Sequence, residues 1–440
     1  VSSANIEAML TEGLSAEQAF VGNQSGNIQS AKTQAVGKHE ASYFYPFLNH
    51  APMEPMNATA VWTPERCDAW VPTQDGEASL AAVIDAAGLP AAQCDVHKIN
   101  LGGGFGRRGA AQDFTRQAVL IAKQMPGTPI KLMWTREEDM TQGRYHPVMA
   151  CKLTGTFDAN KKLTGVHMRL SGQSILASVR PAVVEQQKGR DPLVFQGLAE
   201  SGEHGLGYTF PNMLIDHAMR NPHVPPGFWR GVNINQNAIY IECFMDELAL
   251  SLKQDPVAFR LRHLSDPRAI AVIQKTIGQA PWWHDRSQDE EGVGRGFAYA
   301  RYKNTGAWCA VAVRILAGTS VRVTDISIAA DVGLVINPDG VKSQLEGGAI
   351  QSCSWTLKEE LKFSHEAITT RTWEDYPILM FSEVPAVTVS LIPQPNEPSV
   401  GAGEATQGPT AAAIGNAVFD ALGVRIRQLP ITMERILAAD

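Results

Sequence analysis

The residues with the clearest potential for chemistry form a glycine-rich loop, Leu101–Gly109, with the sequence LGGGFGRRG. Gly104, Gly106 and Gly109 give it the spacing G-x-G-x-x-G, between an expected strand and an expected helix. Glycine N–H groups approach anionic oxygens closely, and the start of a following helix adds positive potential. The loop therefore predicts contact with a large anionic cofactor or with the metal of that cofactor.

A nicotinamide or flavin dinucleotide is the rival cofactor for the Gly104–Gly109 loop. The dinucleotide fingerprint adds an acidic residue roughly 20 positions downstream, and an acidic cluster at 137–139 lies a little beyond that distance. Arg107 and Arg108 weigh against this interpretation, because they occupy the positions where the helix should pack tightly on its strand. A simple glycine-rich turn is the third interpretation, and all three stay open at this point.

A second loop, VGAGEATQG, carries Glu404 between small residues, including Gly401 and Gly403. Such a carboxylate has no bulky neighbour in sequence to exclude a substrate, so beside a cofactor it could act as a general base. Composition alone favours the simpler alternative, a loop carboxylate that faces solvent.

The elements that must position these loops belong to an ordinary globular chain of 440 residues, long enough for two or more domains. The net charge of −7 argues against nucleic-acid binding. No window approaches the apolar length of a membrane helix. The six cysteines are scattered without a C-x-x-C pair, which predicts buried free thiols and neither zinc nor a local iron–sulfur cluster.

Strand-like runs alternate with helical runs from about residue 43 to 264, which predicts mixed α/β packing. We expect a hairpin over 151–172, a helix over 237–264 interrupted by Pro256, and a final helix over 410–424. A stretch rich in charge, Pro and Gly marks the best internal boundary. The predicted organisation is a linker or the tail of a preceding domain over 1–42, a first domain over 43–275 and a second over 276–440.

Five motifs occur in an order that matches a known family: NHAPMEPMNATAVW (49–62), LGGGFGRR (101–108), PPGFWRGV (225–232), AADVGLVINPDGVKSQLEGGAIQ (329–351) and VGAGEATQGPTAAAIGNAVFDALGVRIRQLP (400–430). With them the sequence resembles the molybdopterin-binding large subunit of the xanthine oxidase family. The nearest branch is the isoquinoline 1-oxidoreductase β-subunit, with its related membrane-associated aldehyde dehydrogenases. The resemblance implies an α+β fold with two elongated molybdopterin-binding domains.

The resemblance also implies a cofactor and a set of residues around it. The cofactor is molybdenum held by the dithiolene of a molybdopterin, often in the cytosine dinucleotide form, with no direct metal ligand from this chain. Glu404 would be the catalytic base, and Arg230 would lie beside the metal centre. The remaining cofactor contacts implied are Gly103, Gly104, Phe105, Gly106, Gly403, Ala413 and Asn416.

The sequence also departs from the family pattern. Purine-oxidising members have an acid and a stacking aromatic where this chain has Gly109 and Val232, so xanthine is not the expected substrate. The branch carries a G-Q-G stretch for the cofactor phosphates near its N-terminus, and this chain has none. We therefore expect the chain to correspond to the C-terminal part of such a large subunit.

The implied reaction is oxidation of an aldehyde to a carboxylic acid, or hydroxylation of an N-heteroaromatic carbon next to nitrogen. Because the chain has no cluster-binding cysteines, the electrons require a [2Fe–2S] small subunit, with a cytochrome c as a further candidate partner. The N-terminal part of the molybdopterin subunit completes the expected hetero-oligomer, and the family suggests a periplasmic or periplasm-facing membrane complex. A scaffold subunit without an active centre of its own is the non-enzymatic alternative.

Overall fold

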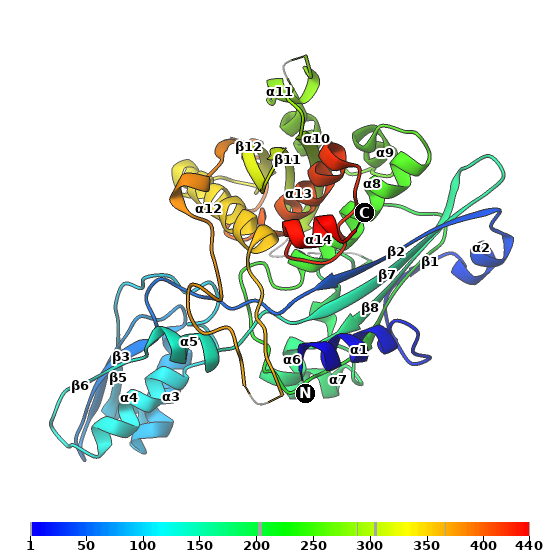
Figure 1. Ribbon diagram of the computed structural model, residues 1–440. Helices are drawn as coiled ribbons and strands as arrows, with labels where there is room; N and C mark the ends of the chain where they lie inside the picture. Colours follow the sequence, from blue (N-terminus) through cyan, green and yellow to red (C-terminus); the bar gives the residue numbers. More distant parts are fainter. Residues whose placement is uncertain (1, 201–204, 288, 303–305, 366, 440) are drawn as a thin grey trace.

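The computed structural model of the protein describes residues 2–439 except 201–204, 288, 303–305 and 366. Three β-sheets and the helices packed on them make up the described part of the chain (Figure 1). The predicted mixed α+β class is confirmed.

The largest sheet has five strands in the order β1-β9-β8-β7-β2. The β8–β9 pair is parallel and the other pairs are antiparallel. The strands are β1 (Phe20–Ser25), β2 (Gly37–Tyr45), β7 (Met149–Phe157), β8 (Leu163–Gly172) and β9 (Met213–Met219). The expected hairpin is β7–β8. Where a linker or the tail of a preceding domain was expected over 1–42, residues 2–42 form α1 (Ser3–Gly13), α2 (Ile28–Gln34), β1 and most of β2, and so belong to this sheet.

The second sheet has the order β10-β11-β12-β13, with only β12–β13 parallel. Its strands are β10 (Val293–Tyr302), β11 (Ala307–Ala317), β12 (Val321–Asp331) and β13 (Ala386–Leu391). Helix α13 (Gln407–Leu422) packs tightly on β10, where a Cβ built on Gly296 would lie 1.9 Å from the carbonyl oxygen of Ala413. Only glycine permits so close an approach of helix to strand.

Helix α8 (Ile234–Ser251) lies between these two sheets, and it is buried all round from Ile234 to Ala249. The carboxylates that it buries are paired with arginines, such as Glu242 with Arg260, whose Nε lies 2.7 Å from the carboxylate Oε2. Helix α9 (Pro256–Arg262) follows after the break that Pro256 predicts. One large core joins the two sheets through α8.

A smaller lobe holds the third sheet, in the order β5-β4-β3-β6, and has a separate core (Figure 1, lower left). Its strands are β3 (Asn57–Trp62), β4 (Cys67–Val71), β5 (Cys94–Lys98) and β6 (Ile130–Met133), and its helices are α3 (Gly76–Ala87) and α4 (Asp113–Lys123). The glycine loop joins β5 to α4.

A long connection, residues 358–385, leaves helix α12 (Pro338–Leu357) and returns to β13; we call it the strap. Figure 1 shows it descending from α12 toward α5 (Arg136–Thr141) and back. The Phe363 ring lies 5.7 Å from the Phe47 ring, and Trp373 stacks under the Arg136 guanidinium at 4.6 Å. The strap thus ties the second sheet to the rest of the chain.

The other α-helices are short or peripheral: α6 (Ile175–Val179), α7 (Pro181–Gln186), α10 (Pro267–Gly278), α11 (Pro281–His284) and α14 (Met433–Leu437). Among the helices formed by described residues, none is both long and apolar enough to cross a bilayer. All six cysteines are buried and free, as predicted.

Candidate functional site

A cleft of about 620 Å³ opens where loops from all parts of the fold meet. Its walls come from the end of β4, the glycine loop, the segment before α8, helix α12 and the loop before α13. The residues that line the cleft include Gln74, Gly104, Phe105, Gly106, Arg230, Gln344, Gly347, Gly403 and Glu404.

The glycine loop presents its backbone to this cleft in a strained conformation. Phe105 has a φ of 55° and Gly106 a φ of 106°, in the left-handed region that side chains disfavour. A Cβ on Gly106 would lie 1.8 Å from the carbonyl oxygen of Phe228, so only glycine fits there. The Gly106 N–H donates to Gln74 Oε1 at 3.0 Å. The Phe105 N–H has no acceptor among the described residues and is available to a ligand.

Arg230 joins three walls of the cleft. Its Nε donates to the Gly403 carbonyl at 2.7 Å, and its Nη atoms donate to Gln344 and to Gln351 Oε1. Its own N–H donates to the Phe105 carbonyl at 2.9 Å. Burial lowers the pKa of Arg230, while the nearby Glu404 carboxylate acts in the opposite direction. The guanidinium remains charged and fixes the relative positions of the glycine loop, α12 and the Glu404 loop.

Glu404 is half-buried at the cleft, and both of its carboxylate oxygens accept hydrogen bonds. Oε1 accepts from the Gly231 N–H at 2.8 Å, and Oε2 accepts from the Tyr302 hydroxyl. The Gly231 N–H is turned toward the carboxylate by a φ of 96°, which suits glycine. A carboxylate held at both oxygens points in one direction, as a positioned base requires.

Most of the predicted site residues come together here. Those lining the cleft are Gly103, Gly104, Phe105, Gly106, Arg230, Gly403 and Glu404. Ala413 and Asn416 do not line it. Asn416 donates to the Phe297 carbonyl at 3.0 Å and accepts from Arg425, and the Ala413 backbone packs on Gly296. The small residues of α13 therefore serve sheet packing in the described structure.

Sequence reasoning missed three polar residues at the site: Gln74, Tyr302 and Gln344. Gln74 follows β4 and Tyr302 ends β10, two strands far apart in sequence. Neither belongs to a motif with chemical meaning by spacing. The one signal in the sequence is that a polar residue stands at or just after the end of an expected strand. Many residues of that kind have a structural role only, so the signal does not single out a site.

The dinucleotide alternative does not fit the geometry. A Rossmann loop runs from a strand of a parallel sheet directly into a helix, but β5 is the outer strand of a mixed sheet and α4 begins only at Asp113. Arg107 forms a two-bond ion pair with Asp113. Of the acids predicted for the ribose, Asp139 is buried and paired with Arg136, and Glu138 caps α5.

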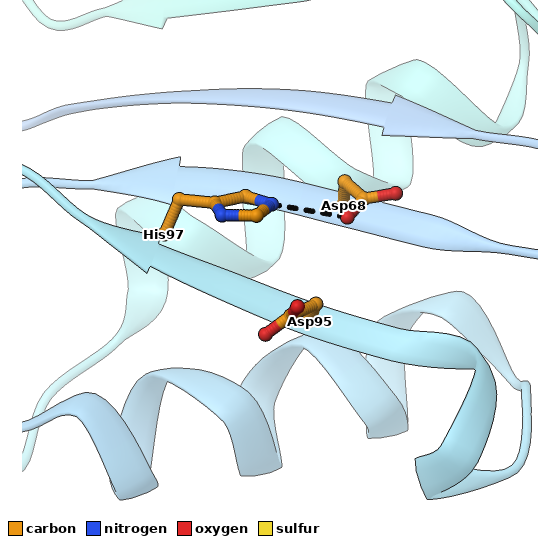
Figure 2. A group of neighbouring side chains, drawn as sticks. All are labelled: Asp68, Asp95 and His97. Carbon is orange, nitrogen blue, oxygen red and sulfur yellow. Dashed lines mark hydrogen bonds and ion pairs between the residues drawn. The ribbon is translucent and has the colours of Figure 1, made fainter.

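A second group of potential ligands lies on β4 and β5, outside the cleft lining. Figure 2 shows His97 pointing toward Asp68, with Asp95 beside them. The His97 Nε2 lies 3.1 Å from Asp68 Oδ1, and Arg66 donates to both oxygens of Asp68. The Arg66 contact lowers the pKa of Asp68. Because Arg66 already occupies this carboxylate, we interpret the group as an ion-pair network and assign no metal to it.

Comparison with known proteins identifies the family to which the chain belongs. The molybdopterin cofactor-binding domain family matches residues 14–264, and a second domain family of the same description matches residues 257–385. The chain belongs to the molybdopterin-binding subunits of the xanthine oxidase family. The resemblance stated from the five motifs is thus confirmed. The predicted boundary near residue 275 stays a prediction.

Curated relatives are longer than this chain. It is 34% identical over 436 residues to one of the subunits of nicotinate dehydrogenase from Pseudomonas putida, covering 94% of this chain and 36% of that protein. It is 30% identical over 391 residues to the beta subunit of isoquinoline 1-oxidoreductase from Brevundimonas diminuta, covering 87% and 48%. The chain therefore spans about a third to a half of these relatives.

Solved structures share the fold at low sequence identity. Quinoline 2-oxidoreductase from Pseudomonas putida 86 superposes with a TM-score of 0.81 at 16% identity, covering 98% of this chain and 81% of that one. Aldehyde oxidoreductase from Desulfovibrio gigas gives a TM-score of 0.78 at 15% identity, covering 96% and 63%.

The residues of the cleft fit a molybdopterin. Phe105 has a left-handed backbone conformation, and its N–H has no acceptor among the described residues. Gly347 on α12 lines the cleft, and a Cβ built on it meets nothing within 4 Å, so there is open space beside the helix. Phe105, Arg230 and Glu404 would surround the group from three sides.

Proposed function

We propose that this chain is the catalytic part of a molybdenum hydroxylase, which oxidises an aldehyde or an N-heteroaromatic carbon next to nitrogen. The observation that carries the proposal is the meeting of Glu404, Arg230 and the Phe105–Gly106 backbone at one cleft. The relatives named for nicotinate, isoquinoline and aldehyde oxidation support both substrate classes.

When bound, the molybdenum cofactor supplies the oxygen atom and accepts the two electrons of the reaction. Glu404, with its carboxylate oriented by the Gly231 N–H and the Tyr302 hydroxyl, would act as the base that takes up a proton during the reaction. The Phe105 N–H would be the backbone donor that helps to hold the bound group. Arg230 holds the walls of the cleft in register through Gly403 and Gln344. Rigid contacts of this kind hold the reacting groups in place, and this lowers the activation free energy because less entropy is lost on reaching the transition state.

We further propose the partners that such a reaction needs. The sequence has no clustered cysteines for an iron–sulfur centre, so a [2Fe–2S] partner chain would take the electrons, with a cytochrome c after it. Segments corresponding to the rest of the longer relatives would complete the cofactor site. The cytosine dinucleotide form and a periplasmic location are part of the same proposal.

Glu404→Gln tests the catalytic assignment in the assembled complex. The amide keeps the shape and can still accept from the Gly231 N–H while it donates to the Tyr302 hydroxyl, but it cannot take a proton. We expect kcat to fall at least about 10²-fold, about 3 kcal/mol of barrier, with molybdenum content unchanged by elemental analysis. Glu65→Gln, at an exposed position, is the control and should leave kcat unaltered. An active complex without molybdenum, or a normal rate in Glu404→Gln, would overturn the proposal.

A further inference from the structure

A second, smaller cavity lies behind the wall that Gly106 and Phe228 give to the cleft. Its volume is about 180 Å³, and both residues line it as well as the cleft. Its other lining side chains are partly apolar, from Ala110, Ala111 and Val179, and partly polar, from His50, Arg107, Arg144 and Ser178. A small cavity that combines apolar side chains with a few polar groups is typical of a site for a small organic molecule.

Arg144 gives this cavity a positive charge that nothing in its lining balances. The side chain is half-buried, and among the described residues it has no ion-pair or hydrogen-bond partner. The other arginine of the lining, Arg107, is neutralised by Asp113 at 2.9 Å. His50 is uncharged at neutral pH, because burial lowers its pKa to about 3. No carboxylate of the described residues lines the cavity.

The backbone around Arg144 is fixed to the segment that leads to the cleft. The Tyr145 N–H donates to the Pro225 carbonyl at 3.1 Å, and the Gly227 N–H donates to the Tyr145 carbonyl at 2.8 Å. A Cβ on Gly227 would lie 2.7 Å from the Arg144 Cβ, so the glycine makes room for the arginine. Arg144 is thereby anchored close to Phe228, two residues before Arg230.

We propose that this cavity is a carboxylate site, in which Arg144 binds the acid group of a small organic anion that the enzyme uses or makes. A half-buried guanidinium is stabilised by a carboxylate, whose two oxygens match its fork of N–H donors. The Ser178 hydroxyl at the rim offers a further donor. The inference deepens the proposed function and rests on it, since it names an acidic substrate or an acidic product.

Binding of benzoate, a simple aromatic carboxylate, tests the site in the assembled complex by calorimetry. We expect Arg144→Gln to weaken benzoate binding at least about 10-fold and Arg144→Lys to weaken it less, with uncharged benzamide binding alike to all forms. Arg322→Gln, an exposed arginine of β12, is the matched control and should bind benzoate normally. Equal benzoate binding by wild type and Arg144→Gln, or none by wild type, overturns the proposal.

Steady-state kinetics of the same variants then show whether the bound acid is the substrate or the product. If the substrate carries the acid, Arg144→Gln raises KM for nicotinate about 10-fold or more and leaves KM for an uncharged pyridine aldehyde unaltered. If the product carries it, inhibition by the product weakens by the same factor and KM is unaltered. Retained molybdenum and activity on the uncharged substrate in every variant would leave the proposed function intact even where benzoate binding refuted the carboxylate site.

Discussion

Glu359, at the start of the strap, is a carboxyl buried without a cation among its described neighbours, and replacing it by glutamine should change how stability depends on pH. Its side chain is 5% exposed and hydrogen-bonds with Ser354 and Tyr376. Burial raises its pKa from 4.5 to about 7. Glutamine keeps the shape and one donor but does not titrate.

The sign and size of the effect follow from proton linkage. Below pH 4.5 the carboxyl is protonated in both the folded and the unfolded chain, so Glu359 adds no pH dependence to the stability there. Between pH 4.5 and 7 only the unfolded chain releases the proton, so the free energy of unfolding falls as pH rises. At about 1.4 kcal/mol per unit, the loss is about 3 kcal/mol by pH 8.

The assay is the melting temperature of Glu359→Gln against wild type, in the same assembly, from pH 4 to 8. With an unfolding entropy of roughly 2.1 cal/mol/K per residue, 3 kcal/mol corresponds to about 3 °C in a chain of this length. The variant should gain this amount relative to wild type between pH 4 and 8. Glu360→Gln, whose carboxylate pairs with Arg435, is the neighbouring control and should show no such gain. A difference that is constant across pH would refute the reasoning.

Three further outcomes are expected. Gly106→Ala should abolish molybdenum content, because its Cβ would meet the Phe228 carbonyl, whereas Gly109→Ala, with 3.3 Å to its nearest neighbour and no positive φ, should retain it. Tyr302→Phe removes the hydroxyl donor to Glu404 and should lower kcat about 10-fold at unchanged molybdenum content. Lowering pH from 7 to 5 should cost about 2 kcal/mol at His217, whose pKa burial lowers to about 4, and His217→Gln should reduce this loss in melting experiments.

Much of the site was predictable only through the resemblance to the family, because the residues alone left three interpretations of the glycine loop open and favoured a solvent-facing Glu404. The glycine loop and Glu404, which follows Gly403, can both be recognised in the sequence, and both line the cleft. Gln74 and Tyr302 were not predictable, since each acquires its role only when β4 and β10 end beside the cleft. Asn416 was expected at the cofactor but does not line the cleft. A helix face of small residues suits a cofactor and a sheet equally well, and here Asn416 hydrogen-bonds to the sheet at Phe297.

The fold was predictable where the hydrophobic periodicity of the sequence is strong, and the prediction failed where the strands are rich in polar residues. Helix α8 and its break at Pro256 followed from the pattern and from proline chemistry. The strands β1 and β2 were missed, because as outer strands they alternate with many exposed polar residues and resemble a linker.

The bonds of Arg230 have a consequence for the order in which the site is made. Glu404 lies 298 residues after Gly106, so at roughly 5–20 residues per second the ribosome delivers it about 15–60 s after the glycine loop. Arg230 is itself made 124 residues after Gly106, and it then lacks the Gln344 side chain for a further 114 residues and the Gly403 carbonyl for a further 173. We therefore expect the cleft to take its described shape only after the Glu404 loop has been synthesised, because Arg230 cannot join the walls of the cleft before then.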